Sequence, residues 1–141
     1  MVPSRLLVPG LILIAITLTS TVPNAYGAAV HRWISMGQIQ CNRVAYGLRA
    51  SASIVLTSNG KEIGSRSLYC LGNETNSGPI VASAKPDGWK MTVVIYDPSQ
   101  NPDLIVCSAT ASGTRFPGSV TLDRTCQFGS ATGTVQKPSM A

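Results

Sequence analysis

Hydrophobic and polar residues alternate along this chain over short stretches. In residues 33–41 (WISMGQIQC), an extended backbone places Ile39 and Cys41 on one side and Gln38 and Gln40 on the other. Similar short apolar segments occur at 50–57, 62–70, 80–84, 89–96, 104–110 and 119–122. No segment has helical spacing over ten or more residues. The pattern predicts an all-β fold, a small antiparallel β-sandwich or barrel, with a mixed β fold containing one short helix as the alternative.

Turn-forming residues separate these segments. Asn59-Gly60 predicts a β-hairpin, because both residues tolerate positive φ. Polar or proline-containing loops are predicted at 71–79, 85–88 and 97–103. The segment 89–96 is apolar on both faces, which predicts a central strand. The residues from about 129 are rich in Ser, Thr, Gly and Pro, and we expect a flexible C-terminal tail there.

The N-terminus has the order of features found in a secretory signal peptide. Arg5 precedes an apolar run at residues 6–18, and small residues follow between 25 and 29. A membrane anchor is the alternative, but the run is shorter than the ~20 apolar residues that a span needs. We therefore expect a signal peptide at residues 1–27, cleaved after Gly27 or, as second choice, after Ala29.

Cleavage leaves residues 28–141 as a single secreted, extracellular domain without a stable membrane span. The whole chain has 11 Lys and Arg residues and 6 Asp and Glu residues, a net charge of +5. Only Arg5 is removed with the signal peptide, so the secreted form stays mildly basic. The basic residues are dispersed, and we predict no nucleic-acid partner. The charge indicates a soluble secreted protein or, alternatively, weak attraction to an anionic surface or polysaccharide.

The four cysteines are widely spaced, at Cys41, Cys70, Cys107 and Cys126. An even number of widely spaced cysteines in an oxidising compartment predicts two disulfides. A zinc site normally has ligands in close pairs such as C-x₂-C, and none occurs here, so we predict no metal site. Three pairings of four cysteines exist, and the spacing does not choose among them.

The sequence contains little that predicts catalysis. His31 is the single histidine and lies close to the expected mature N-terminus, where a catalytic base is not expected. The six acidic residues are Glu62, Glu74, Asp87, Asp97, Asp103 and Asp123. All but Glu62 lie in or beside expected turns, and turn formation is the preferred interpretation over paired catalytic carboxylates. No phosphate-binding or dinucleotide-binding motif is present. We predict a protein that is not an enzyme and has no cofactor.

Two features are relevant to sugars. Asn73-Glu74-Thr75 is an N-glycosylation motif in an expected exposed loop, so Asn73 is predicted to carry a glycan. Aromatic residues that could stack on sugars are Trp33, Trp89, Tyr46, Tyr69 and Tyr96. Trp89 directly follows a turn at the start of a strand, a position more typical of a core anchor than of a sugar platform.

Several segments together resemble the pollen Ole e I and extensin-like family. They are ISMGQIQC (34–41), ASIVLT (52–57), DGWKMTVVI (87–95) and LIVCSATASG (104–113), followed by Cys126. The segment AYGA (25–28), which precedes a tryptophan-containing stretch, is similar to phylloplanin-like plant secreted proteins. The resemblance covers about residues 34–126. The family typically has six cysteines, however, and lacks the hairpin-like segment that precedes Cys70 here.

The resemblance implies disulfides Cys41–Cys126 and Cys70–Cys107. It also implies a non-enzymatic plant extracellular protein, located in the cell wall or apoplast. The expected partners are a cell-wall polysaccharide or another extracellular protein. A cationic secreted defence protein or a pathogen effector is the first alternative function, and a small enzyme or an enzyme inhibitor is the second.

Overall fold

The computed structural model describes residues 32–123 and 126–141. The expected signal peptide at 1–27 and His31 therefore lie outside the described residues. The strands are β2 (Trp33–Asn42), β3 (Arg49–Ser58), β4 (Lys61–Cys70), β5 (Thr75–Ala82), β6 (Gly88–Asp97), β7 (Leu104–Gly113), β8 (Gly118–Leu122), β9 (Ser130–Val135) and β10 (Ser139–Met140). No helix occurs in these residues, so the expected all-β fold is confirmed.

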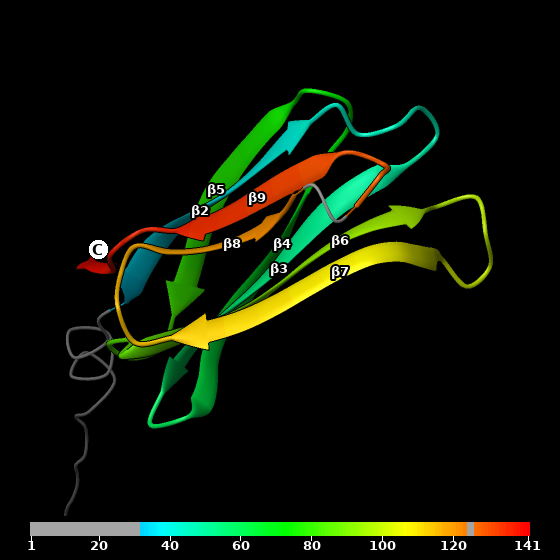
Figure 1. Ribbon diagram of the computed structural model, residues 1–141. Coiled ribbons are helices and arrows are strands. Elements are labelled where there is room, and N and C mark those ends of the chain that lie inside the picture. The colour runs from blue at the N-terminus through cyan, green and yellow to red at the C-terminus, as the bar shows by residue number, and fades with distance from the viewer. Residues whose placement is uncertain (1–31, 124–125) are drawn as a thin grey trace, which may run out of the picture. The chain divides into compact units, whose positions relative to one another are not determined.

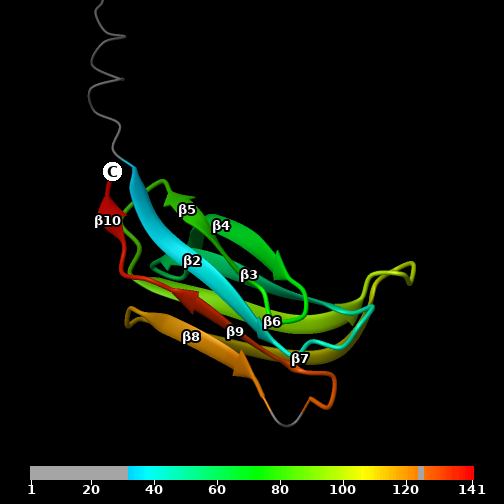
Figure 2. The same ribbon diagram turned by 90° about the horizontal axis from the view of Figure 1, so that it is seen from above.

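The strands form two antiparallel sheets that pack face to face (Figures 1 and 2). In one sheet β2 lies between β5 and β9, β8 follows β9, and the short β10 pairs with the start of β2. The other sheet has the order β4-β3-β6-β7. In the described part of the chain, β4 forms no ladder with β5, and β7 forms none with β8. The fold is therefore a sandwich rather than a closed barrel.

The core between the sheets follows the sequence alternation. Ile39 and Cys41 of β2 are buried, as the first segment predicted. Met91, Val93 and Ile95 of β6 are fully buried, and β6 lies between β3 and β7, which confirms it as a central strand. Burial of these side chains provides the main driving force for the packing of the two sheets.

The hairpin expected at Asn59-Gly60 is confirmed. Ser58 and Lys61 are paired, and the two residues between them have φ values of 52° and 77°. Positive φ at both central positions matches the right-handed twist of the flanking strands.

The expected polar loop at 71–79 is wrong in its second half. β5 begins at Thr75 and pairs with β2, so that Pro79 lies opposite Met36. Proline is tolerated because β5 is an edge strand and needs no N–H donor on its outer side. The polar residues 75–77 are exposed because they lie on an edge strand, and they do not indicate the absence of a strand.

The expected flexible tail from about 129 is also wrong. Ser130–Val135 form β9, which lies between β2 and β8. Ala131 and Val135 are buried, and Gly133 is closely covered by the Met91 sulfur. The small side chains at Ala131 and Gly133 fit the close contact with the other sheet, whereas Ser130, Thr132 and Thr134 lie on the partly exposed face of the strand. The Ser, Thr and Gly composition therefore does not indicate disorder.

All four cysteines form disulfides, as expected, but the pairing implied by the family resemblance is wrong. The bonds are Cys41–Cys70 and Cys107–Cys126, each with a Cα–Cα distance of 5.9 Å. Cys41 of β2 and Cys70 of β4 are both buried and come from opposite sheets. Cys107 lies on β7, and Cys126 follows β8 in the other sheet. Each disulfide thus links the two sheets.

Candidate binding site

One end of the sandwich collects four loops, which we call the loop end: residues 43–48, 71–74, 98–103 and 123–129, with 124–125 outside the described residues. Backbone hydrogen bonds join three of these loops. The amide of Val44 donates to the carbonyl oxygen of Gly72 at 3.1 Å, and that of Ala45 donates to Phe128 at 2.9 Å. Cys70 and Cys126 lie in or next to these loops, so both disulfides also hold this end.

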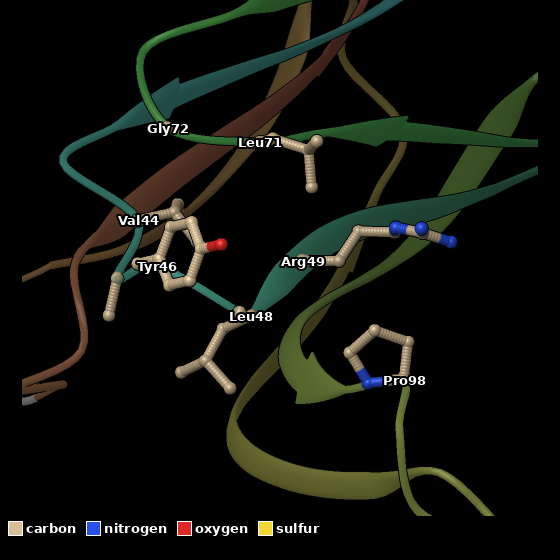
Figure 3. A pocket seen from close by; sticks show the side chains of 9 residues that line it. Val44, Tyr46, Leu48, Arg49, Leu71, Gly72 and Pro98 are labelled. Atoms are coloured by element: carbon tan, nitrogen blue, oxygen red, sulfur yellow. The ribbon is translucent and has the colours of Figure 1, made fainter.

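A groove of about 540 Å³ lies at the loop end (Figure 3). It is lined by Val44, Ala45, Tyr46, Gly47, Leu48, Arg49, Leu71, Gly72 and Pro98. Most of these residues are apolar, and they come from the loops after β2, β4 and β6 and from the first residue of β3. Their separation in sequence explains why sequence reasoning missed the groove, since Leu71 and Pro98 sit in segments that otherwise read as polar loops.

A tight turn presents Tyr46 to solvent beside the groove. The amide of Leu48 donates to the carbonyl oxygen of Ala45 at 3.0 Å, and Gly47 has a φ of 86°. Positive φ at the third residue of a turn is the type II arrangement, which glycine adopts readily. Tyr46 is fully exposed, with a relative exposure of 105%. Its ring is therefore free to stack on a ligand.

Arg49 brings a positive charge to the groove. It is the first residue of β3, it lies opposite Tyr96 of β6, and it is exposed. Figure 3 shows Arg49 and Pro98 on one side of the groove and Tyr46 on the other. Within the part of the chain that the structure describes, Arg49 forms no ion pair. Its guanidinium is therefore available to an anionic ligand.

The structure divides the aromatic residues into buried and exposed groups. Trp89 is 7% exposed and its Nε1 donates to the carbonyl oxygen of Arg115 at 2.8 Å, which confirms it as a core anchor. Tyr96 is also buried. Trp33 is half-buried, and Lys85 Nζ lies 5.6 Å from the centroid of its ring. None of these three rings presents a free face comparable to that of Tyr46.

Tyr69 is the second exposed tyrosine, with half of its surface accessible. It lies on the outer face of β4 and contributes to a shallow hollow with Val94, Tyr96 and Ile105. Tyr46 and Tyr69 are thus the two predicted stacking residues that the fold leaves accessible.

Acidic side chains hold the turns, as the sequence predicted. Oε1 of Glu74 accepts a hydrogen bond from the Leu71 amide at 2.9 Å. Oδ2 of Asp87 accepts one from the Asn59 amide at 3.0 Å. In residues 32–123 and 126–141, no group of three His, Cys, Asp or Glu side chains is placed to hold a metal ion. The carboxylates of Glu74 and Asp87 therefore stabilise the conformation of their loops.

Asp97 starts the loop that carries Pro98. Its Oδ1 accepts hydrogen bonds from the Ser99 hydroxyl at 2.7 Å and from the Ser99 amide at 3.0 Å. These two hydrogen bonds lower the pKa of Asp97 below its ordinary value of 3.8, and the bond from the Ser99 hydroxyl has the larger effect. The charged form is favoured because both groups donate to the carboxylate.

The lowered pKa predicts a pH-dependent contribution of Asp97 to stability. A carboxyl whose folded pKa lies below its unfolded pKa stabilises the fold fully above the unfolded value, and this contribution is lost as the pH falls through the folded value. We expect Asp97→Ala to lower the unfolding temperature slightly at neutral pH and to match the wild type well below pH 3.8. Thermal unfolding of both proteins across this range tests it, with Asp103→Ala as a matched control. An equal difference at all pH values would contradict the assignment.

Asn73 of the predicted glycosylation motif lies in the 71–74 turn and is exposed. Its Oδ1 accepts a hydrogen bond from the Arg43 amide at 2.8 Å. The side-chain nitrogen of Asn73, which is the atom that carries an N-linked glycan, takes no part in this bond. Glycosylation of Asn73 stays a prediction, and its position is compatible with the modification.

No protein-family model matches the chain, and no curated protein matches it. The described residues contain no helix with the length and apolar character needed to cross a membrane.

Proposed function

We propose that this protein is a non-enzymatic, secreted binding protein of the Ole e I-like type that binds a wall or surface polysaccharide through its loop end. The observation that carries the proposal is the groove lined by Tyr46, Leu48 and Leu71, with Arg49 and Pro98 on its other side. Disulfides suit an oxidising, extracellular location. Residence in a plant cell wall or apoplast and a glycan on Asn73 belong to the same proposal.

The form of the groove supports a sugar ligand. Sugars present an apolar face of C–H groups and a rim of hydroxyls, so an exposed tyrosine ring next to aliphatic side chains suits them. Two of the three loops that line the groove, 43–48 and 71–74, are joined by a backbone hydrogen bond and lie next to the Cys41–Cys70 disulfide. A preformed groove loses little conformational freedom on binding, which favours a measurable affinity from a small contact area.

Arg49 selects an acidic polysaccharide over a neutral one. A guanidinium matches the geometry of a carboxylate, such as that of a uronic acid residue in pectin. Because the groove is open and Arg49 is exposed, the attraction is screened by salt, with a Debye length of ~8 Å at physiological ionic strength. The binding is therefore expected to be weak and sensitive to salt.

Substitutions at the groove test the proposal. With oligogalacturonate as the probe in a titration at low salt, Tyr46→Ala is expected to raise the Kd roughly three- to tenfold through loss of stacking. Arg49→Gln is expected to raise it about two- to fivefold and to flatten its salt dependence. Lys61→Gln is the matched control: it removes the same charge from the opposite end of the sandwich, at the β3–β4 hairpin.

Two results would contradict the proposal. Equal losses in Arg49→Gln and Lys61→Gln would show that only net charge attracts the ligand and that the groove has no role. The second result is full affinity of the wild type in molar salt together with full affinity of Tyr46→Ala. Neither the positive charge nor the tyrosine ring would then account for binding.

A further inference from the structure

Apart from the two-residue β10, the two sheets have four edge strands, β4, β5, β7 and β8. An edge strand presents unpaired backbone N–H and C=O groups, and proteins commonly protect such edges with charges, prolines or short length. β5 contains Pro79, and β8 has only five residues. β4 carries Lys61, Glu62 and Arg66, and Nη1 of Arg66 donates to the carbonyl oxygen of Pro79 at 3.0 Å. Three of the four edges thus have a recognisable protection.

The edge of β7 has no charge, no proline and full length, and its one bulge, at Val106, lies before the segment 108–112. The strand has ten residues, LIVCSATASG, without a charged residue or a proline. β7 pairs with β6 on one side only, and within residues 32–123 and 126–141 its backbone forms no hydrogen bond outside that ladder. From Ser108 onward the side chains are small, and most of them are exposed. Another strand can therefore approach this edge without steric or electrostatic obstruction.

We propose that the β7 edge binds the β7 edge of a second copy of this chain in an antiparallel pair, with the two-fold axis at Thr110. The segment Ser108–Ser112 reads Ser-Ala-Thr-Ala-Ser, the same in both directions. In this register Ser108 lies opposite Ser112 of the partner subunit, and the two copies of Thr110 lie opposite each other. A symmetric dimer requires a self-complementary surface of this kind. The palindromic segment therefore favours a second copy of this chain, rather than an unrelated peptide, as the partner of the edge.

The side chains fit this pairing on both faces. Residues alternate in direction along a strand, so the three hydroxyl residues lie on one face and the two alanines on the other. Hydroxyl pairs across neighbouring strands already occur in this protein, between Thr92 and Thr110 at 3.0 Å and between Thr121 and Thr132 at 3.1 Å. The pairing would extend the row formed by Thr110, Thr92 and Ser53 into the second copy.

Charge does not oppose the pairing. The row through Thr110 has no charged residue on β6, β3 or β4, where its members are Thr92, Ser53 and Ser67. Lys90 lies one strand inward, opposite Ser112. In the dimer the two lysines lie on opposite sides of the axis, each next to a neutral edge. The segment is short and its side chains are small, so the contact falls below the ~1,200–2,000 Å² of stable interfaces and the association is weak and reversible.

The dimer would also affect polysaccharide binding, an inference that rests on the function proposed above. Antiparallel pairing directs the two loop ends away from each other. Two grooves at opposite ends would let one dimer bridge two polysaccharide chains and would raise its avidity for a wall surface.

Sedimentation equilibrium over a range of protein concentrations tests the dimer. The wild type is expected to associate reversibly, and Thr110→Lys is expected to weaken association roughly tenfold, because two like charges meet on the axis and the hydroxyl pair is lost. Ser53→Lys is the matched control, with the same charge on the same face two strands from the edge. It should associate as the wild type does. A wild type that stays monomeric at all concentrations, or equal association of the two lysine variants, would overturn the proposal.

A second variant keeps the test decisive if Thr110→Lys fails to fold. Thr110→Cys places two thiols across the axis, where directly opposed Cβ atoms in a strand pair lie about 4.5–5.5 Å apart. Mild oxidation should yield a covalent dimer in which the substituted peptide is joined to itself, whereas Ser53→Cys should stay monomeric. Equal cross-linking of both variants, or of neither, would contradict pairing at this edge. Oligogalacturonate binding by a strictly monomeric protein would reject the dimer alone and leave the proposed function standing.

Discussion

Replacement of Cys41 and Cys70 by alanine is expected to lower the free energy of unfolding by about 3–4 kcal/mol. The disulfide joins β2 of one sheet to β4 of the other and closes a sequence separation of 29 residues. Without this link, the unfolded chain gains conformational freedom in proportion to the logarithm of the loop length. A domain of this size has a total stability of only about 5–15 kcal/mol, so the loss is a large share of it.

Denaturant unfolding followed by tryptophan fluorescence measures this effect. The control is the double alanine replacement of Cys107 and Cys126, which opens a separation of 19 residues and should lose slightly less, about 3 kcal/mol. Because the first disulfide joins strands next to the 43–48 and 71–74 loops, its loss should also weaken ligand binding at the groove. An unchanged denaturation midpoint in both double variants would show that the disulfides contribute nothing to stability.

Trp89→Ala is expected to cost about 3–5 kcal/mol of stability, comparable to the loss of a disulfide. The indole is 7% exposed and lies closely against Gly113 and Gly118, which have no side chain to compete for its space. Its Nε1 donates to the Arg115 carbonyl oxygen and so ties β6 to the loop between β7 and β8. Truncation removes buried apolar surface, leaves a cavity and leaves a carbonyl oxygen without this partner.

Two further variants separate these contributions. Trp89→Phe keeps most of the ring but removes the N–H donor, and its expected loss from the hydrogen bond is about 1 kcal/mol, in addition to a smaller packing defect. Tyr46→Ala removes a fully exposed ring and should leave stability within about 0.5 kcal/mol of the wild type. If Trp89→Ala were as stable as Tyr46→Ala, the assignment of Trp89 as a core anchor would be wrong.

The sequence alone predicted the features that depend on neighbouring residues or on residue counts. The alternation in residues 33–41 and 89–96 identified the inner faces of β2 and β6, because side chains of a strand point alternately to opposite sides. Asn59-Gly60 located the β3–β4 hairpin through the φ values that these residues tolerate. The wide spacing of four cysteines predicted two disulfides. These signals are local, so they need no knowledge of which strands become neighbours.

Only the tertiary structure decided the features that depend on distant segments. The disulfide pairing is set by which cysteines of opposite sheets face each other at the loop end, and the family resemblance implied the wrong partners. In Ser130–Val135 the polar residues alternate with buried small ones, and Gly133 lies closely against Met91 of the other sheet, a contact that composition does not reveal. The groove gathers Tyr46, Leu71 and Pro98 from three loops. Each of these outcomes is a long-range contact, and no periodicity or turn motif within a single segment encodes one.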